Sequence, residues 1–156
     1  MRRHSRGFTL VEILIVVIIL GILAAIVIPQ FTQASSAARE VNLKTNLKTM
    51  RNQLLLYKVQ HLDVLPTSSL VTQLTQYTDL SGGTATARDA THTFGPYLQA
   101  FPVNSVSNSA AVRVVTTAFA APTTDGGWWY NSTTGEVRVD LKDSYVSTDG
   151  TKYNAF

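Results

Sequence analysis

The feature that most constrains this chain is an unbroken apolar run close to its N-terminus. Residues 13–28 are all aliphatic, alanine or glycine, and together with residues 8–12 they form a stretch whose single charge is Glu12. As a helix rising about 1.5 Å per residue, the stretch is roughly 31 Å long, enough to cross the hydrocarbon core of a bilayer. We therefore expect one membrane-spanning helix near the start of the chain.

Charge is distributed unevenly around this span. Of 13 basic residues, Arg2, Arg3 and Arg6 precede the span without an acid, so the rest of the chain holds ten cations against its 10 acids. Basic flanks stay in the cytoplasm, so we expect a cytoplasmic N-terminus and everything after Pro29 outside. The balanced remainder offers no basic patch, and no nucleic-acid partner is expected.

Composition excludes several kinds of chemistry. The chain has no cysteine, which excludes disulfides, thiolate metal sites and cysteine nucleophiles. No zinc-binding HExxH pattern, phosphate-binding glycine loop or nucleophile elbow recruits the three histidines, His4, His61 and His92, which we expect at the surface. Charged residues make up only 15% of the chain, against roughly 25% in ordinary soluble domains. We expect no enzyme, but a chain packed in lipid or against its own copies.

A secretory signal peptide is the simplest alternative for the N-terminus. Small residues at 34–38 could serve as its cleavage site. The apolar block is somewhat long for such a peptide, and it contains the acid Glu12. A lone carboxylate near lipid costs on the order of a few kcal/mol, so Glu12 is expected to be functional and to have a partner.

Gly7, Phe8, Glu12, the apolar run and Pro29 together resemble the N-terminal signature of type IV pilins and type II secretion pseudopilins. The resemblance implies that a prepilin peptidase cuts between Gly7 and Phe8 and methylates the new amine of Phe8. Residues 1–7 would then be a leader peptide, and Glu12 the fifth residue of the mature chain. A pilin-like fold and a homo-polymeric filament are also implied, with an inner-membrane assembly platform and minor pseudopilins as partners.

The chemistry of the processed terminus can be argued independently of the resemblance. Cleavage creates an α-amine on Phe8 that is mostly cationic at neutral pH, close to the carboxylate of Glu12. In a low dielectric the two charges attract strongly, and each is costly alone. Glu12 could pair with its own amine or with that of a neighbouring subunit, and it also suits the positive end of a helix. Pairing between subunits would fix their axial register.

The helix is expected to continue to about Leu62 with a changed character. Pro29, a second candidate assembly residue, should kink or loosen it. Beyond Pro29, apolar residues recur at alternating spacings of three and four and form one stripe. The stripe consists of Leu43, Leu47, Met50, Leu54 and Tyr57.

The rest of the chain predicts a small antiparallel sheet of three or four strands against this stripe, an α+β pilin-like fold. We expect a short helix after Thr67 or Ser68, a loop over 79–93, a strand over 112–117 and a hairpin over 128–141. Neighbours on a strand face opposite ways, so one of Trp128 and Trp129 should be buried and the other partly exposed. The polar tail, 142–156, is not placed by any pattern.

The expected organisation is a leader (1–7), a membrane and polymerisation helix (8–30) and an extracytoplasmic globular domain (31–156). The glycine and aromatic residues around 126–130 are similar to those of the major pseudopilin of type II secretion, and the lack of cysteine agrees with it. Such pseudopilins often bind calcium, for which Asp125, Asp140 and Asp143 are weak candidates because their spacing matches no known calcium loop. We therefore expect no cofactor.

Three uses of the chain remain open from sequence. The favoured one is a subunit of a secretion pseudopilus, anchored in the inner membrane by one span and then incorporated into a periplasmic or extracellular filament. The second is a surface type IV pilus for adhesion, motility or DNA uptake. The third is a monomeric, signal-anchored binding protein outside the cytoplasm.

The mass of the intact mature protein separates the filament subunits from the monomer. We expect a chain that begins at Phe8 and carries one extra methyl group, because a prepilin peptidase removes 1–7 and methylates the new amine. Mass spectrometry of the protein from cells tests this. A retained leader, or a terminus near 34–38, would contradict the proposed processing.

Overall fold

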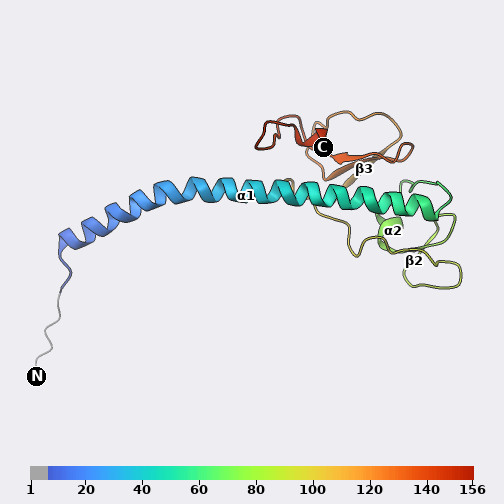
Figure 1. The fold of residues 1–156 in the computed structure, drawn as a ribbon, viewed down its shortest axis with the longest axis horizontal. Helices are drawn as coiled ribbons and strands as arrows, with labels where there is room; N and C mark the ends of the chain where they lie inside the picture. Colours follow the sequence, from blue (N-terminus) through green and yellow to red (C-terminus); the bar gives the residue numbers. More distant parts are fainter. Residues whose placement is uncertain (1–6) are drawn as a thin grey trace, which may run out of the picture. The chain divides into compact units, whose positions relative to one another are not determined.

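The computed structural model describes residues 7–156, so the leader residues Arg2, Arg3, His4 and Arg6 lie outside the described part. The elements in chain order are α1 (Leu10–Gln60), α2 (Leu70–Thr75), β1 (Tyr77–Thr78), β2 (Thr84–Ala85), β3 (Val112–Val115), β4 (Trp128–Asn131), β5 (Val137–Val139) and the 3-10 helix η1 (Tyr153–Ala155) (Figure 1). The predicted α+β class is confirmed. Contacts divide the chain into two units, one up to Ala38 and one from Arg39 to Phe156.

The first unit consists of the N-terminal part of α1. Its large apolar side chains are all exposed, from Phe8 at 81% to Phe31 at 75%. By length and composition, α1 is the one helix within residues 7–156 that could cross a bilayer. The helix continues through Pro29, which cannot donate the usual bond to the Ala25 carbonyl. A local loosening at Pro29 stays a prediction.

The second unit has its core on the C-terminal part of α1. The predicted stripe is confirmed, because all of its members are at most 3% exposed. They pack against the inner face of a three-stranded sheet and against α2. The partners from these elements are Leu70, Leu74, Trp128, Tyr130, Val137 and Val139.

The three-stranded sheet has the order β3-β4-β5. The predicted hairpin is confirmed, since β4 and β5 pair antiparallel with Tyr130 opposite Val137. Strand β3 runs parallel to β4, with Val112 opposite Trp128, so the sheet is mixed and not antiparallel throughout. The reason is the connection at 116–127, which is long enough to return the chain to the starting edge, as a parallel pair requires.

A second, two-stranded sheet occupies part of the segment predicted as a loop. Strands β1 and β2 pair antiparallel, with Thr78 opposite Thr84. The turn between them contains Gly82 at φ 86°, a conformation that favours glycine. Helix α2 lies where the sequence predicted it, but its N-cap residue is Ser69, without a side-chain cap, in place of Thr67 or Ser68.

The expectation that one tryptophan is exposed is wrong, because Trp128 and Trp129 are both 0% exposed. Trp128 faces the core, and its Nε1 donates to the Pro102 carbonyl at 2.8 Å. Trp129 lies on the other face of the sheet, where the ring of Phe119 packs edge-on at 5.2 Å. The connection at 116–127 therefore covers a face that the alternation predicted as exposed.

The C-terminal tail packs onto α1. Glu40, 7% exposed, accepts a bond from the Thr148 amide at 3.2 Å and pairs with Lys44 at 2.7 Å. Asn154 donates to the Leu141 carbonyl at 2.9 Å, which ties η1 to the end of the hairpin. Residues 40 and 148 are far apart in sequence, so no local pattern predicts that the tail packs onto α1.

Two adjacent leucines test the placement of the helix stripe. Leu54 is 3% exposed and Leu55 is 63% exposed. We expect Leu54→Ala to lower the free energy of unfolding by about 2–5 kcal/mol through lost burial and a cavity. Leu55→Ala, the matched control, should change it by less than about 0.5 kcal/mol. Chemical unfolding of the full chain in detergent measures both, and equal losses would contradict the assigned face.

Candidate functional site

The predicted processing site lies just ahead of α1. Phe8 is 81% exposed, and nothing lies within 4 Å of the position that a Cβ on Gly7 would take. The peptide bond between the two residues precedes the first helical residue, Leu10. Within the described residues, this bond is therefore open to a protease, and cleavage there leaves α1 intact.

Glu12 takes part in a reciprocal cap at the start of α1. The backbone N–H and the hydroxyl of Thr9 both donate to Glu12 Oε2 at 2.8 Å, and the Glu12 N–H donates to the Thr9 hydroxyl at 3.2 Å. This is the capping box that a threonine three residues before a glutamate forms. Glu12 Oε1 makes no hydrogen bond within residues 7–156 and remains available to a further donor.

The candidate metal ligands are each engaged separately. Asp140 pairs with Arg113, whose Nη2 lies 2.5 Å away, and Asp143 pairs with Lys152 at 2.6 Å. Asp125 lies 3.5 Å from Lys142 Nζ and accepts a bond from the Tyr145 hydroxyl at 3.2 Å. Among residues 7–156, no group of three or more acids and histidines is arranged to hold a metal ion. The three candidate aspartates therefore do not share one ligand set within the described residues.

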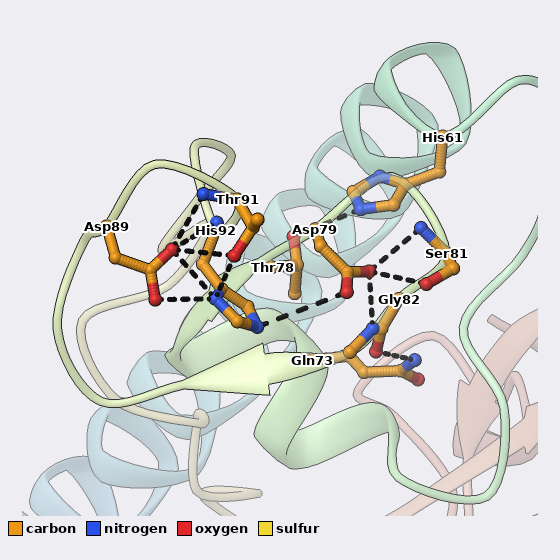
Figure 2. A network of polar contacts seen from close by, with 10 residues as sticks. His61, Gln73, Thr78, Asp79, Ser81, Gly82, Asp89, Thr91 and His92 are labelled. Atoms are coloured by element: carbon orange, nitrogen blue, oxygen red, sulfur yellow. Dashed lines mark hydrogen bonds and ion pairs between the residues drawn. The ribbon is translucent and has the colours of Figure 1, made fainter.

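A polar network surrounds the turn between β1 and β2 (Figure 2). Asp79 Oδ1 accepts bonds from the Ser81 N–H, the Ser81 hydroxyl and the Gly83 N–H, each at 2.8 Å. These bonds, led by that of the Ser81 hydroxyl, lower the pKa of the Asp79 carboxyl below its ordinary value. The carboxylate of Asp79 therefore stays charged and shapes the turn.

His92 lies between two carboxylates of this network (Figure 2). Its Nδ1 is 2.8 Å from Asp89 Oδ2, and its Nε2 is 4.0 Å from Asp79 Oδ2. The His92 N–H donates to Asp89 at 2.7 Å, and this bond is the main reason that the pKa of Asp89 is lowered. The loop after β2 is thereby fastened to the turn before it.

The expectation of a surface position for His61 is wrong, since it is 1% exposed. Its ring stacks on Tyr57 with centroids 3.8 Å apart, and its Nε2 lies 3.0 Å from the Thr78 hydroxyl. Burial raises the pKa of Tyr57 to about 12. His61 continues the buried stripe by one turn, a role that its spacing of four residues from Tyr57 indicates.

An open pocket of about 530 Å³ lies beside the polar network. Leu62 and Leu80 supply its apolar walls, and Asp79, Ser81 and Thr91 supply polar groups. No sequence pattern predicted this pocket, because its walls come from the turn after α1 and from the segment after β1. The exposed apolar residue directly after Asp79 was the available signal.

The structure does not bring the candidate residues into one site. Gly7, Phe8, Glu12 and Pro29 lie in the first unit, and the three aspartates and the network lie in the second. Thr9 is the functional residue that the sequence analysis missed, although the capping-box spacing to Glu12 could have identified it.

The chain matches a family model described as "Prokaryotic N-terminal methylation motif" over residues 2–28. The type IV narrow pilus major component PilA5 of Thermus thermophilus is 33% identical over 86 residues, which cover 55% of this chain and 73% of that protein. No solved structure matches the chain significantly.

Proteins of secretion systems also match. The type II secretion system core protein G of Pseudomonas aeruginosa is 43% identical over 60 residues, which cover 38% of this chain and 42% of that protein. The type IV major pilin protein PilA of Myxococcus xanthus is 51% identical over 47 residues, 30% of this chain and 21% of that protein. The chain thus spans less than half the length of these two relatives.

The Asp79 turn predicts a contribution to acid stability. A carboxyl whose pKa is lowered by folding stabilises the fold above its unfolded pKa, near 3.9, and that stabilisation is lost as the pH falls through the folded value. Asp79→Asn keeps an oxygen acceptor for the turn but has no proton to take up. We expect its melting temperature to fall less than that of the wild type between about pH 5 and pH 3.

Thermal unfolding at a series of pH values measures this difference. Asp63→Asn is the matched control, because the Asp63 side chain is 88% exposed and its nearest cation, Lys58, is 3.9 Å away. An acid response of Asp79→Asn identical to that of the wild type would contradict the assigned role.

Proposed function

The chain belongs to the family of type IV pilins and type II secretion pseudopilins, and from this premise we propose that it is the structural subunit of a helical filament. A prepilin peptidase cuts after Gly7 and methylates Phe8. The subunit is anchored in the inner membrane by α1, with its N-terminus in the cytoplasm, and is then moved into a homo-polymer. None of the three named relatives is described as an enzyme, and the proposed role is likewise structural.

The observation that carries the proposal is the geometry at the start of α1. One oxygen of Glu12 closes the capping box with Thr9, and the other has no hydrogen bond within residues 7–156. An amine on the N-terminus of an adjacent subunit could bind this second oxygen without breaking the cap. The carboxylate thereby supports folding of its own helix and marks the register of the next subunit.

The span supplies the driving force of the proposed assembly. Its apolar side chains are exposed within the described chain, so lipid or other spans must surround them. Removal of 1–7 takes away the three arginines that oppose movement of the helix out of the membrane. During assembly, contacts of each helix with lipid are replaced by contacts with other helices. The carboxylate of Glu12 then pairs with the amine of a neighbouring subunit. At Pro29 the helix lacks one internal hydrogen bond. We therefore propose that the helix bends at this residue when it packs against its neighbours.

Within the family we favour a secretion pseudopilus that works with an inner-membrane assembly platform and minor pseudopilins. The absence of cysteine, the hairpin of β4 and β5 with its two tryptophans, and the similarity to core protein G support this choice. The proposal includes no cofactor and no nucleic-acid partner.

A surface type IV pilus is the second candidate. It is favoured by the Thermus pilus component, of which the chain covers 73%. The two uses differ in where the filament is found. Immunogold labelling of cells would show either filaments on the outer surface at native expression, or subunits confined to the envelope until secretion is active.

Substitutions of Glu12 separate its two roles. Glu12→Gln keeps an acceptor for the capping box but removes the charge, and Glu12→Ala removes both. We expect both variants to be processed and inserted but to yield few filaments, because the neighbouring amine then has no carboxylate. Electron microscopy of sheared material measures the yield, and immunoblotting measures processing.

Thr9→Ala is the matched control, since it removes the hydroxyl of the cap and leaves the charge of Glu12 in place. It should assemble much better than Glu12→Gln. A wild-type filament yield from Glu12→Gln would mean that Glu12 acts only as a helix cap. That result would contradict its pairing with the amine of a neighbouring subunit.

A further inference from the structure

The pocket beside the polar network combines apolar walls with one carboxylate oxygen, Asp79 Oδ2, that accepts no hydrogen bond within the described residues. Leu62 is 74% exposed and Leu80 is 50% exposed, so both walls are open to a partner. Asp79 Oδ1 is used fully by the turn, as Figure 2 shows, whereas Oδ2 has His92 Nε2 only at 4.0 Å, beyond hydrogen-bond distance. A ligand that fits has an aliphatic stem to lie on the leucines and a cation at its end, which describes a lysine side chain.

The second unit holds few cations that could serve as this ligand. Six of its basic residues have an ion pair with an acid: Lys44, Lys58, Arg113, Arg138, Lys142 and Lys152. Among the described residues from Arg39 onward, the arginines and lysines outside these pairs are Arg39, Lys48, Arg51 and Arg88. Arg51 is occupied by the carbonyls of Val137 and Phe156, at 2.8 Å each.

Side-chain chemistry separates the remaining cations. Arg39 is exposed, but it ends in a broad, planar guanidinium, whereas the pocket suits the compact ammonium of a lysine, and Lys48 is the one lysine of this set. Arg88 belongs to the loop that already carries Asp89 and His92. Lys48 is exposed and is seven residues from Val41, itself 65% exposed, so the two share the face of α1 turned away from the core.

We propose that Lys48 of a second copy of this chain docks into the pocket between Leu62 and Leu80 and binds Asp79. The inference rests on the proposed filament and adds the contact between globular units. Within one chain, roughly 18 Å of helix separate Lys48 from Gln60, the last residue of α1, and Leu62 lies in the turn beyond, too far for the side chain of Lys48 to reach its own pocket. The partner must therefore be another copy.

The two surfaces differ, since one is a helix face and the other a pocket, so the contact is heterologous. A heterologous contact that does not close into a ring builds an open helical polymer.

Cysteine crosslinking tests the contact directly, because the natural chain has no cysteine. Thr45→Cys places a thiol one turn before Lys48, and Leu80→Cys places one on the pocket wall, with Lys48 and Asp79 both kept. The two full-length variants are expressed together in filament-producing cells, and sheared filaments are treated with a short thiol crosslinker. Thr45→Cys expressed with Val146→Cys is the control, since Val146 is 51% exposed, like Leu80 at 50%.

We expect crosslinked dimers from the Thr45 and Leu80 variants and few from the control pair. Filaments with no excess of that dimer over the control would overturn the docking and leave the filament standing. A wild-type chain that never forms filaments would overturn the proposed function as well, so the two failures are distinguishable.

A charge substitution gives a second readout. Lys48→Met should lower the filament yield about fivefold, the effect of losing one partly exposed ion pair, whereas Arg39→Met should leave the yield unchanged. Adding Asp79→Asn to Lys48→Met should cause no further loss, because the pair is already broken. Equal effects of Lys48→Met and Arg39→Met, or additive losses in the double variant, would contradict the pairing.

Discussion

The structure depends on one constraint, an apolar helix surface that the chain cannot cover with its own residues. From Phe8 to Phe31 the large side chains of α1 are exposed, and the core of the second unit begins only at Leu43. Burial of such a surface requires lipid or other copies of the helix. The two environments demand the same apolar residues, so the same span suits both states of the proposed subunit, anchored in lipid and bundled in a filament.

Glu12 interrupts the apolar surface, and the capping box explains how the chain tolerates it. The Thr9 N–H donates to the Glu12 carboxylate and the Glu12 N–H donates to the Thr9 hydroxyl, so two amides that a helix start leaves without partners are satisfied. A carboxylate held in this way is already oriented. In the proposed filament, its other oxygen distinguishes a neighbour with an amine from an equally apolar neighbour without one. There, apolar packing supplies the strength of the assembly, and this charge supplies its register.

Sequence patterns predicted the elements that depend on interactions between residues close together in the chain. The stripe ending at Tyr57 and the hairpin of β4 and β5 follow from periodicity and turn residues. The parallel pairing of β3, the burial of Trp129 and the anchoring of the tail by Glu40 do not, because each depends on contacts between segments far apart in sequence. His61 was predicted at the surface because histidine is a polar residue type, although its spacing from Tyr57 puts it on the buried face. At the candidate site, the signature around Gly7 and Phe8 was visible in sequence, whereas the pocket at Leu80 required the fold.

The charges of the second unit show why a weak contact between subunits can still be selective. Most of its cations are neutralised by an acid of the same chain, as Arg113 is by the almost fully buried Asp140. Locally neutralised pairs attract other copies weakly, so they favour no particular arrangement. Lys48 and Asp79 Oδ2 differ, because within the described residues Lys48 has no ion pair and Asp79 Oδ2 has only His92 Nε2 nearby, at 4.0 Å. An exposed ion pair adds little affinity. It still gives selectivity, because an arrangement that brings two like charges together is disfavoured. Affinity can therefore reside in the helices while orientation is set by a single exposed pair.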